Sequence, residues 1–135
     1  MAFFTDDISI NTIIGAGSAI AGDIRVNGIV RIEGDIDGNI EATGNIFVGE
    51  KARIRGNITA ASAEICGIII GDVVAPKGIR LLSSAAVIGD IFTKRIEIED
   101  RVILHGHCIA IKDEGEYELS AKQFTEEKVI RNKVV

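Results

Sequence analysis

Residues 86–91 read Ala-Val-Ile-Gly-Asp-Ile, and variants of this pattern recur along most of the chain. An aliphatic residue stands two positions before each glycine, and a further apolar residue stands two positions after it. Asp or Asn follows the glycine directly in five of the six copies, and His107 follows it in the last. The repeated glycines are Gly22, Gly38, Gly56, Gly71, Gly89 and Gly106. This nearly constant spacing, with a mean of about 17 residues, predicts a repeat architecture.

A second column of alternating apolar residues lies upstream of the glycines. Its pairs are Ile46 and Val48, Ile79 and Leu81, Ile96 and Ile98, Val30 and Ile32, Ala63 and Ile65, and the weaker Thr12 and Ile14. Alternation with period two indicates β-strands, whose successive side chains point to opposite faces. Three short strands and three corners in about 17 residues close one coil of a solenoid, and stacked coils lie about 4.8 Å apart. We therefore predict an all-β, triangular β-helix of about six coils.

The repeated glycine and the residue after it are expected to form a corner of each coil. Glycine alone adopts positive φ, or allows close backbone approach, without strain. Asp or Asn in the next position can bond to nearby backbone groups. A ladder of such bonds is the favoured interpretation of this column, because calcium-binding β-rolls need tandem G-G-x-G-x-D repeats that are missing from the sequence. The uneven coil lengths favour a right-handed coil over a left-handed one.

Composition agrees with a single solenoid domain of 135 residues. The chain is 47% hydrophobic but only 4% aromatic, which suits a narrow interior filled by Ile and Val. Fifteen glycines and one proline, Pro76, suit a fold that needs many corners and intact strand ladders.

A net charge of −5 argues against nucleic acid as a partner, and the charges around Arg53 and Arg55 indicate a mixed solvated surface. Cys66 and Cys108 suggest no disulfide framework, and no signal peptide or long apolar run is visible, so we expect a cytoplasmic location.

Both termini fall outside the repeat, so we divide the chain into residues 1–7, 8–111 and 112–135. Met1, Phe3 and Phe4 form an apolar N-terminal tip that is expected either to insert into a membrane surface or to fold over the first coil. Two buried Phe side chains contribute only about 1.5–3 kcal/mol each, so such an anchor needs the avidity of an oligomer. In the C-terminal tail, Tyr117 and Leu119 suggest one more strand. Ser120 and Gln123 resemble a capping box that would start a helix over 120–132, with a mobile tail as the alternative.

Residues with the potential for chemistry are few. His105, His107 and Cys108 have metal-ligand side chains, but alternation points the two histidines outward and Cys108 inward, which is too few ligands for zinc. The glycines of residues 15–22 lack the spacing of a dinucleotide fingerprint. No catalytic set is visible, and the short, similar coils leave no room for a loop insertion that could build a pocket. We predict a protein that is not an enzyme and needs no metal, cofactor or nucleotide.

The two ends of a solenoid expose unpaired backbone groups and an apolar cross-section, which invites another copy to stack there. No polar cap is evident at either end of the repeat. The residues expected to form the polymer interface are Ile10, Ile14 and Ile20 at one end and Val102, Leu104 and Ile109 at the other. Symmetric joints at both ends would give a filament without polarity.

The order of these repeats resembles the bactofilin family over about residues 14–109. The segments that carry the resemblance are residues 21–24, 30–34, 52–58, 86–91 and 104–108. It implies a right-handed β-helix that polymerises without nucleotide into non-polar filaments, head to head and tail to tail. It also implies attachment to the inner face of the cell membrane through an N-terminal peptide, a part for which Phe3 and Phe4 have the right character. The resemblance further implies that such filaments position cell-wall or polarity proteins and thereby affect cell shape.

Two other interpretations of the repeat stay open at this point. One is a left-handed hexapeptide-repeat acyltransferase, typically a trimer, whose three equal faces tolerate little variation in coil length. The other is a monomeric solenoid adaptor whose tails cap both ends.

Overall fold

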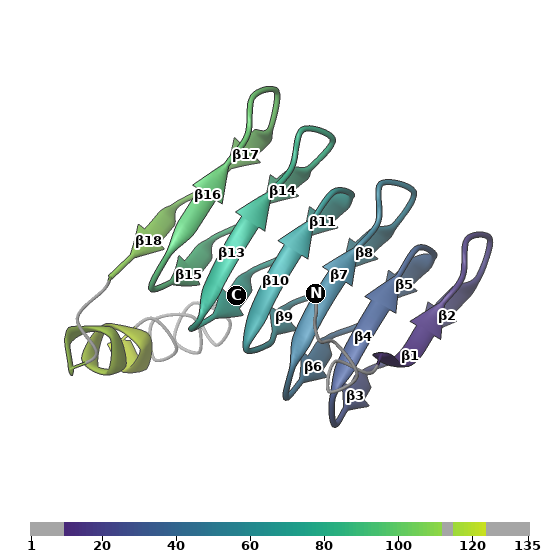
Figure 1. Cartoon of the computed structure of the whole chain (residues 1–135), viewed down its shortest axis with the longest axis horizontal. Coiled ribbons are helices and arrows are strands. Elements are labelled where there is room, and N and C mark those ends of the chain that lie inside the picture. Colours follow the sequence, from purple (N-terminus) through teal and green to yellow (C-terminus); the bar gives the residue numbers. More distant parts are fainter. Residues whose placement is uncertain (1–9, 112–114, 124–135) are drawn as a thin grey trace, which may run out of the picture.

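A computed structural model describes residues 10–111 and 115–123 of the chain. Residues 10–111 form a coil of three parallel sheets, and residues 115–123 form a short helix (Figure 1). Sheet A contains β1 (Ile10–Ile14), β4 (Ile29–Ile32), β7 (Asn45–Val48), β10 (Ser62–Ile65), β13 (Gly78–Leu81) and β16 (Ile96–Ile98). Sheet B contains β2 (Ala19–Ala21), β5 (Asp35–Asp37), β8 (Arg53–Arg55), β11 (Ile68–Ile70), β14 (Ala86–Ile88) and β17 (Ile103–His105). Sheet C contains β3 (Ile24–Val26), β6 (Ile40–Ala42), β9 (Ile58–Thr59), β12 (Val73–Ala75), β15 (Ile91–Thr93) and β18 (Cys108–Ala110).

Each coil contributes one strand to each sheet, so the six coils give three sheets of six strands. The predicted all-β solenoid of about six coils is therefore confirmed. In each sheet a strand pairs in parallel with the equivalent strand of the next coil, so that equivalent residues of the repeat lie side by side. The first and last coils form the two ends of the rod in Figure 1.

The core is a stack of aliphatic side chains pointing into the coil, as the apolar columns predicted. In sheet B the inward column runs Ile20, Ile36, Ile54, Ile69, Val87 and Leu104. The four inner members of this column are at most 3% exposed. Burial of an aliphatic side chain stabilises the fold by about 1.5–3 kcal/mol, so these columns supply the main stabilising term.

The repeated glycines lie at the corner between sheets B and C, as predicted. All six have positive φ, from 126° at Gly22 to 158° at Gly38. At Gly71 an added Cβ would also overlap the carbonyl oxygen of Gly56 in the preceding coil. Gly22 has no such neighbour, because no coil precedes its own in the part of the chain that the structure describes. The corner thus needs glycine twice over, for its φ and for close coil-to-coil contact.

The residues after these glycines form the predicted hydrogen-bond ladder, which we call the corner ladder. Each Asp or Asn Oδ1 accepts a hydrogen bond from the backbone N–H of the equivalent residue in the next coil, over 2.9–3.0 Å. The ladder runs through Asp23, Asn39, Asn57, Asp72 and Asp90 and ends at the N–H of His107. It absorbs the variation in coil length, since both the shortest and the longest coils keep the same bond.

The C-terminal segment differs from prediction, because residues 115–123 are helical. Tyr117 and Leu119 therefore do not form a further strand, and Ser120 lies inside this helix instead of starting one. The reason is that Tyr117 finds an apolar partner on the side of the rod. Its ring is 5% exposed and meets Phe92 edge to face, with centroids 4.8 Å apart. Lys94 Nζ lies 5.2 Å from the Tyr117 ring centroid.

The helix docks on the outer surface of sheet C, where Phe92 points away from the core between the inward-facing Ile91 and Thr93. Figure 1 shows it beside the last coils of the rod. The Tyr117 hydroxyl is buried without a hydrogen-bond partner among the described residues, and burial raises the pKa of this phenol. Of the helices in the described part of the chain, none has the length and apolar character to cross a bilayer.

Candidate assembly interface

The N-terminal end of the described rod is formed by β1, β2 and β3. Among the described residues, each of these strands has a neighbouring strand on one side only. Ile14 stacks on Ile32 and is nearly buried, whereas Ile20 stacks on Ile36 and is half-buried. Ile24, which was not among the predicted interface residues, stacks on Ile40 and is also half-buried. The strand edges and these side chains together form a partly apolar end surface.

The C-terminal end has the same construction and is more exposed. β16, β17 and β18 form its open edges. Leu104 stacks on Val87 and is half-buried, as is Val102 at the preceding corner. Ile98 continues the inward column of Leu81 but is 51% exposed, because no further coil covers it among residues 10–111 and 115–123. Ile98 is an end-surface residue that the sequence reasoning missed, although its apolar column was visible in the repeat.

Ile109, one of the predicted interface residues, lies on the outer side of its strand. Ile109 pairs with Phe92 in the outward column of sheet C, so it does not belong to the apolar cross-section of the end. The inward position on this strand belongs to Cys108, which pairs with Ile91. Ile10 pairs with Ile29 next to a register shift, and its side chain lies outside the described part of the structure, as do Met1, Phe3 and Phe4.

The end coils therefore have the same residue types as the inner coils but lack a neighbouring coil on one side among the described residues. An inner Ile is covered on both sides along its column, whereas described residues cover Ile20 and Leu104 on one side only. Unpaired edge strands above an apolar column are a template for pairing with another chain. The geometry of both ends suits association through strand pairing and aliphatic stacking.

Comparison with known proteins supports an assembly role for these end surfaces. Residues 12–109 match the family model described as "Bactofilin: Polymer-forming cytoskeletal". The chain belongs to the bactofilin family. This match excludes the acyltransferase interpretation of the repeat, and the family is one of cytoskeletal polymers.

Two curated relatives of this bactofilin come from Myxococcus xanthus. Bactofilin BacO is 30% identical over 97 residues, which cover 72% of this chain and 77% of BacO. Bactofilin BacP is 22% identical over 96 residues, which cover 71% of this chain but only 40% of BacP. Among solved structures, the bactofilin of Thermus thermophilus in double helical filaments aligns with a TM-score of 0.66 and 27% identity, over 73% of this chain and 98% of that chain.

The histidines of this bactofilin lie at the C-terminal end, on the outside. His105 and His107 are exposed, and His107 Nδ1 lies 3.3 Å from Asp90 Oδ1. Within the described residues no group of three His, Cys, Asp or Glu side chains is placed to hold a metal ion. Burial raises the pKa of the Cys108 thiol, which keeps it protonated near neutral pH. Of these residues, His107 forms the last rung of the corner ladder through its backbone N–H.

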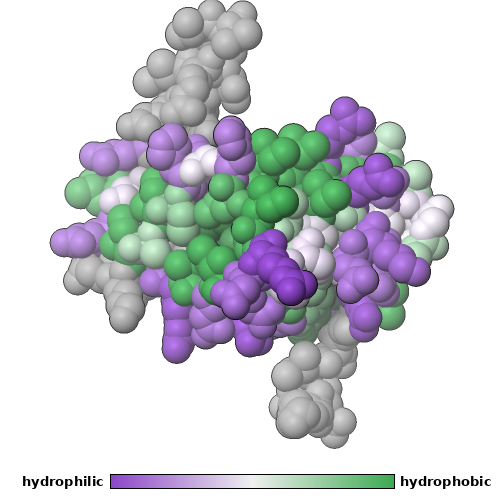
Figure 2. Space-filling view, turned by 90° about the horizontal axis from the view of Figure 1, so that it is seen from above, coloured by the Kyte–Doolittle hydropathy of each residue, from purple (hydrophilic) through white to green (hydrophobic). Residues whose placement is uncertain are grey.

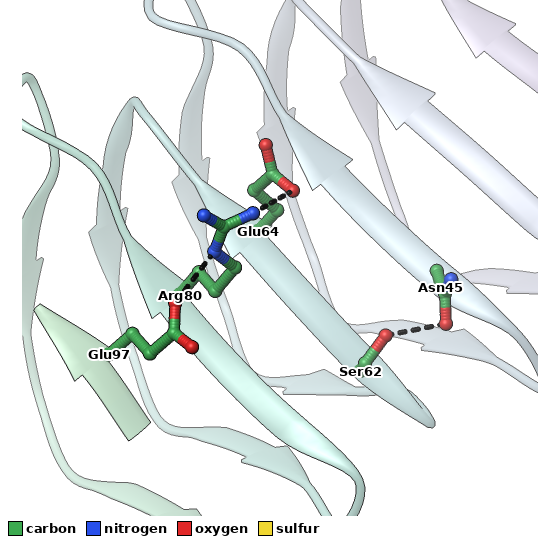
Figure 3. A network of polar contacts seen from close by, with 5 residues as sticks. All are labelled: Asn45, Ser62, Glu64, Arg80 and Glu97. Atoms are coloured by element: carbon green, nitrogen blue, oxygen red, sulfur yellow. Dashed lines mark hydrogen bonds and ion pairs between the residues drawn. The ribbon is translucent and has the colours of Figure 1, made fainter. Parts of the chain in front are cut away.

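The outer face of sheet A carries a network that satisfies its own charges (Figure 3). Arg80 lies between two carboxylates, 3.0 Å from Glu97 Oε2 through Nε and 3.7 Å from Glu64 Oε2 through Nη1. The Ser62 hydroxyl donates to Asn45 Oδ1 over 2.5 Å. Exposed pairs of this kind contribute only about 0–1 kcal/mol each. Their main effect is to leave this face with few charges free for a partner.

Proposed function

We propose that this chain is a cytoskeletal scaffold, not an enzyme, and that it polymerises without nucleotide by stacking its end coils on like ends of other copies. The observation that carries the proposal is the sheet B column, which is buried at Ile54 and Ile69 but half-buried at Ile20 and Leu104. A second copy would cover these side chains and pair the free strand edges. Joints between like ends would produce a filament without polarity.

The test is Leu104→Arg, with Ile103→Arg as its matched control. Leu104 points into the end surface, whereas its neighbour Ile103 points outward from the same strand and is 63% exposed. We expect Leu104→Arg to give soluble monomers or dimers, because an unpaired charge in the joint is strongly unfavourable. Ile103→Arg should still form filaments in electron micrographs and sedimentation without nucleotide. Normal filaments from Leu104→Arg would contradict the assigned end.

We further propose that the filaments bind the inner face of the cell membrane through Met1, Phe3 and Phe4. The support is the apolar character of this tip and the family resemblance; many weak tips on one polymer would bind by avidity. Deleting residues 1–5 should leave filaments intact but prevent them from pelleting with liposomes. Unchanged pelleting would refute the anchor. Membrane-bound filaments would then position cell-wall or polarity proteins in the cytoplasm.

The filaments are also proposed to associate sideways in pairs. The related filaments of T. thermophilus are double helical, which supports lateral pairing as a property of this assembly. The end surfaces cannot supply a lateral contact, because they lie across the rod axis. A separate surface on the side of the rod is required.

A further inference from the structure

The outer face of sheet B differs from the other sides of the rod in carrying both free charges and exposed aliphatic side chains. We call it the lateral face. Its two outward columns run Ala19, Asp35, Arg53, Ile68, Ala86, Ile103 and Ala21, Asp37, Arg55, Ile70, Ile88, His105. Figure 2 shows a hydrophobic area flanked by hydrophilic side chains on this side of the molecule. Ile68, Ile70 and Ile88 are 39%, 46% and 46% exposed.

The charges of the lateral face lie opposite one another without forming ion pairs. Asp35 is the register partner of Arg53, and Asp37 is the register partner of Arg55. Among the described residues, none of these four takes part in an ion pair within 4.0 Å. Charges on the other faces do pair, as Arg25 does with Glu41 at 3.3 Å. Two carboxylates and two guanidinium groups are therefore available to a partner.

We propose that the lateral face is the contact between paired filaments, and that its occupant is the same face of a second copy running in the opposite direction. A two-fold axis along the strands, between β5 and β8, brings unlike rungs together. It sets Asp35 and Asp37 against Arg53 and Arg55 of the second copy. It also sets Ala19 and Ala21 against Ile68 and Ile70, so small apolar side chains meet large ones. This proposal rests on the polymer proposed above.

The alternative of two copies running in the same direction does not fit the charges. In that arrangement each rung meets its own equivalent, so the Asp35 and Asp37 rung faces a second acidic rung and the Arg53 and Arg55 rung faces a second basic one. Like charges held opposite one another repel. The order of rungs along the face, apolar, acidic, basic, apolar, thus favours opposed rods.

The surface of these four rungs is hollowed, and the hollow is lined by β2, β5, β8 and β11. Two hollows facing each other leave room for extended arginine side chains to cross to the opposite carboxylates. Bidentate pairing of arginine with a carboxylate is the strong form of such a contact. The shape of the face is therefore consistent with charge pairing between copies.

The size of the contact explains why it would operate in filaments only. Four rungs at about 4.8 Å and strands of three residues at about 3.3 Å per residue cover roughly 190 Å² per copy in projection. A stable pair of proteins buries about 800 Å² per partner. Single subunits should therefore not pair, whereas many contacts repeated along two polymers should hold them together.

The test uses two double variants with opposite charge. Asp35→Arg with Asp37→Arg makes both central rungs basic, and Arg53→Asp with Arg55→Asp makes both acidic. Each variant, assembled alone, should give single filaments, with the fraction of paired filaments in electron micrographs at least tenfold below wild type. Mixing the two kinds of preformed filament should restore pairs, because every basic rung then meets an acidic one. The quadruple variant that exchanges all four charges should pair like wild type.

The matched control is Arg25→Asp with Arg31→Asp, which changes the net charge by the same amount as the acidic variant but lies on sheets C and A. It should pair normally. Pairing that survives in both lateral-face variants, or that mixing fails to restore, would overturn the proposal, as would wild-type filaments that are always single. If the acidic variant pairs normally but loses binding to anionic phosphatidylglycerol vesicles, the face contacts lipid and the proposal is wrong. If the wild-type protein forms no filaments at all, the proposed function itself is refuted.

Discussion

The inner coils and the end coils are built from the same repeat, yet only the inner coils are complete. Ile54 and Ile69 are covered by equivalent side chains on both sides and are at most 1% exposed. Ile20 and Leu104 occupy the same column at the ends and remain half-buried. The difference teaches that burial in a solenoid depends on a residue's neighbours along the rod more than on its own identity.

The largest difference between the two regions is expected at the corner glycines. Gly71→Ala should destabilise the fold by about 2–6 kcal/mol, because it combines a strained φ with overlap against the Gly56 carbonyl. Gly22→Ala introduces only the strained φ and should cost about 1–3 kcal/mol. Urea unfolding followed by circular dichroism, in the Leu104→Arg background that limits assembly, measures both. Equal losses would show that coil-to-coil contact is not what requires glycine.

The core columns should show the same contrast with a smaller effect. Ile69→Ala should lower the free energy of unfolding by about 2–5 kcal/mol, because it leaves a cavity in a fully buried column. Ile20→Ala should cost only about 1–2 kcal/mol in the monomer fraction of the same background, where no second copy covers the N-terminal end, since half of the benefit of burial is missing there. A loss at Ile20 as large as that at Ile69 would mean that the first coil is already covered.

Hydrogen exchange can compare the rungs of the corner ladder. Asn57→Ala removes the acceptor for the Asp72 N–H and should cost about 0.5–1.5 kcal/mol. The Asp72 amide should then exchange faster, while the Asn39 amide, bonded to Asp23, should keep its rate. In the wild-type protein the Asp23 amide, which has no acceptor among the described residues, should exchange fastest of the ladder. Exchange that is unchanged at Asp72 would show that its bond is dispensable.

Alkylation of the two cysteines compares an inner coil, which holds Cys66, with the last coil, which holds Cys108, and we expect the smallest effects here. Burial raises the pKa of the Cys66 thiol, and Glu64, Glu50 and Glu99 raise it further, so its alkylation should be slow at pH 7 and accelerate as the pH rises. Glu64→Gln should speed that reaction about twofold by removing a neighbouring negative charge. Cys108 lies on the end surface, so polymerisation should protect it from iodoacetamide but leave Cys66 unchanged. Equal protection of both thiols would argue against joints at the ends.

The sequence was sufficient to predict the coil, the corner glycines and the inward columns, because each depends on period and residue type alone. It was insufficient where both alternating positions are aliphatic. Taken alone, the run Ile68 to Ile70 does not reveal which members face outward, and only its place before Gly71 assigns Ile69 to the inward column. Ile109 was assigned to the end surface although alternation already pointed Cys108 of the same strand inward. Tyr117 became helical because Phe92, more than a full coil earlier in the chain, offers a tertiary contact that local pattern does not contain. The placement of Asp35 opposite Arg53 and of Asp37 opposite Arg55 on the lateral face likewise depends on register.

The corner ladder makes each rod directional, because in every rung a backbone N–H of the later coil donates a hydrogen bond to a side-chain oxygen of the earlier coil. The series begins at Asp23 and ends at His107, whose imidazole replaces the side-chain oxygen of the other rungs. A filament made of such rods is consequently a string of stiff segments joined by seams where this series is interrupted. Bending and severing under mechanical load should concentrate at those seams, so the length of one polypeptide would set the spacing of the polymer's breaking points.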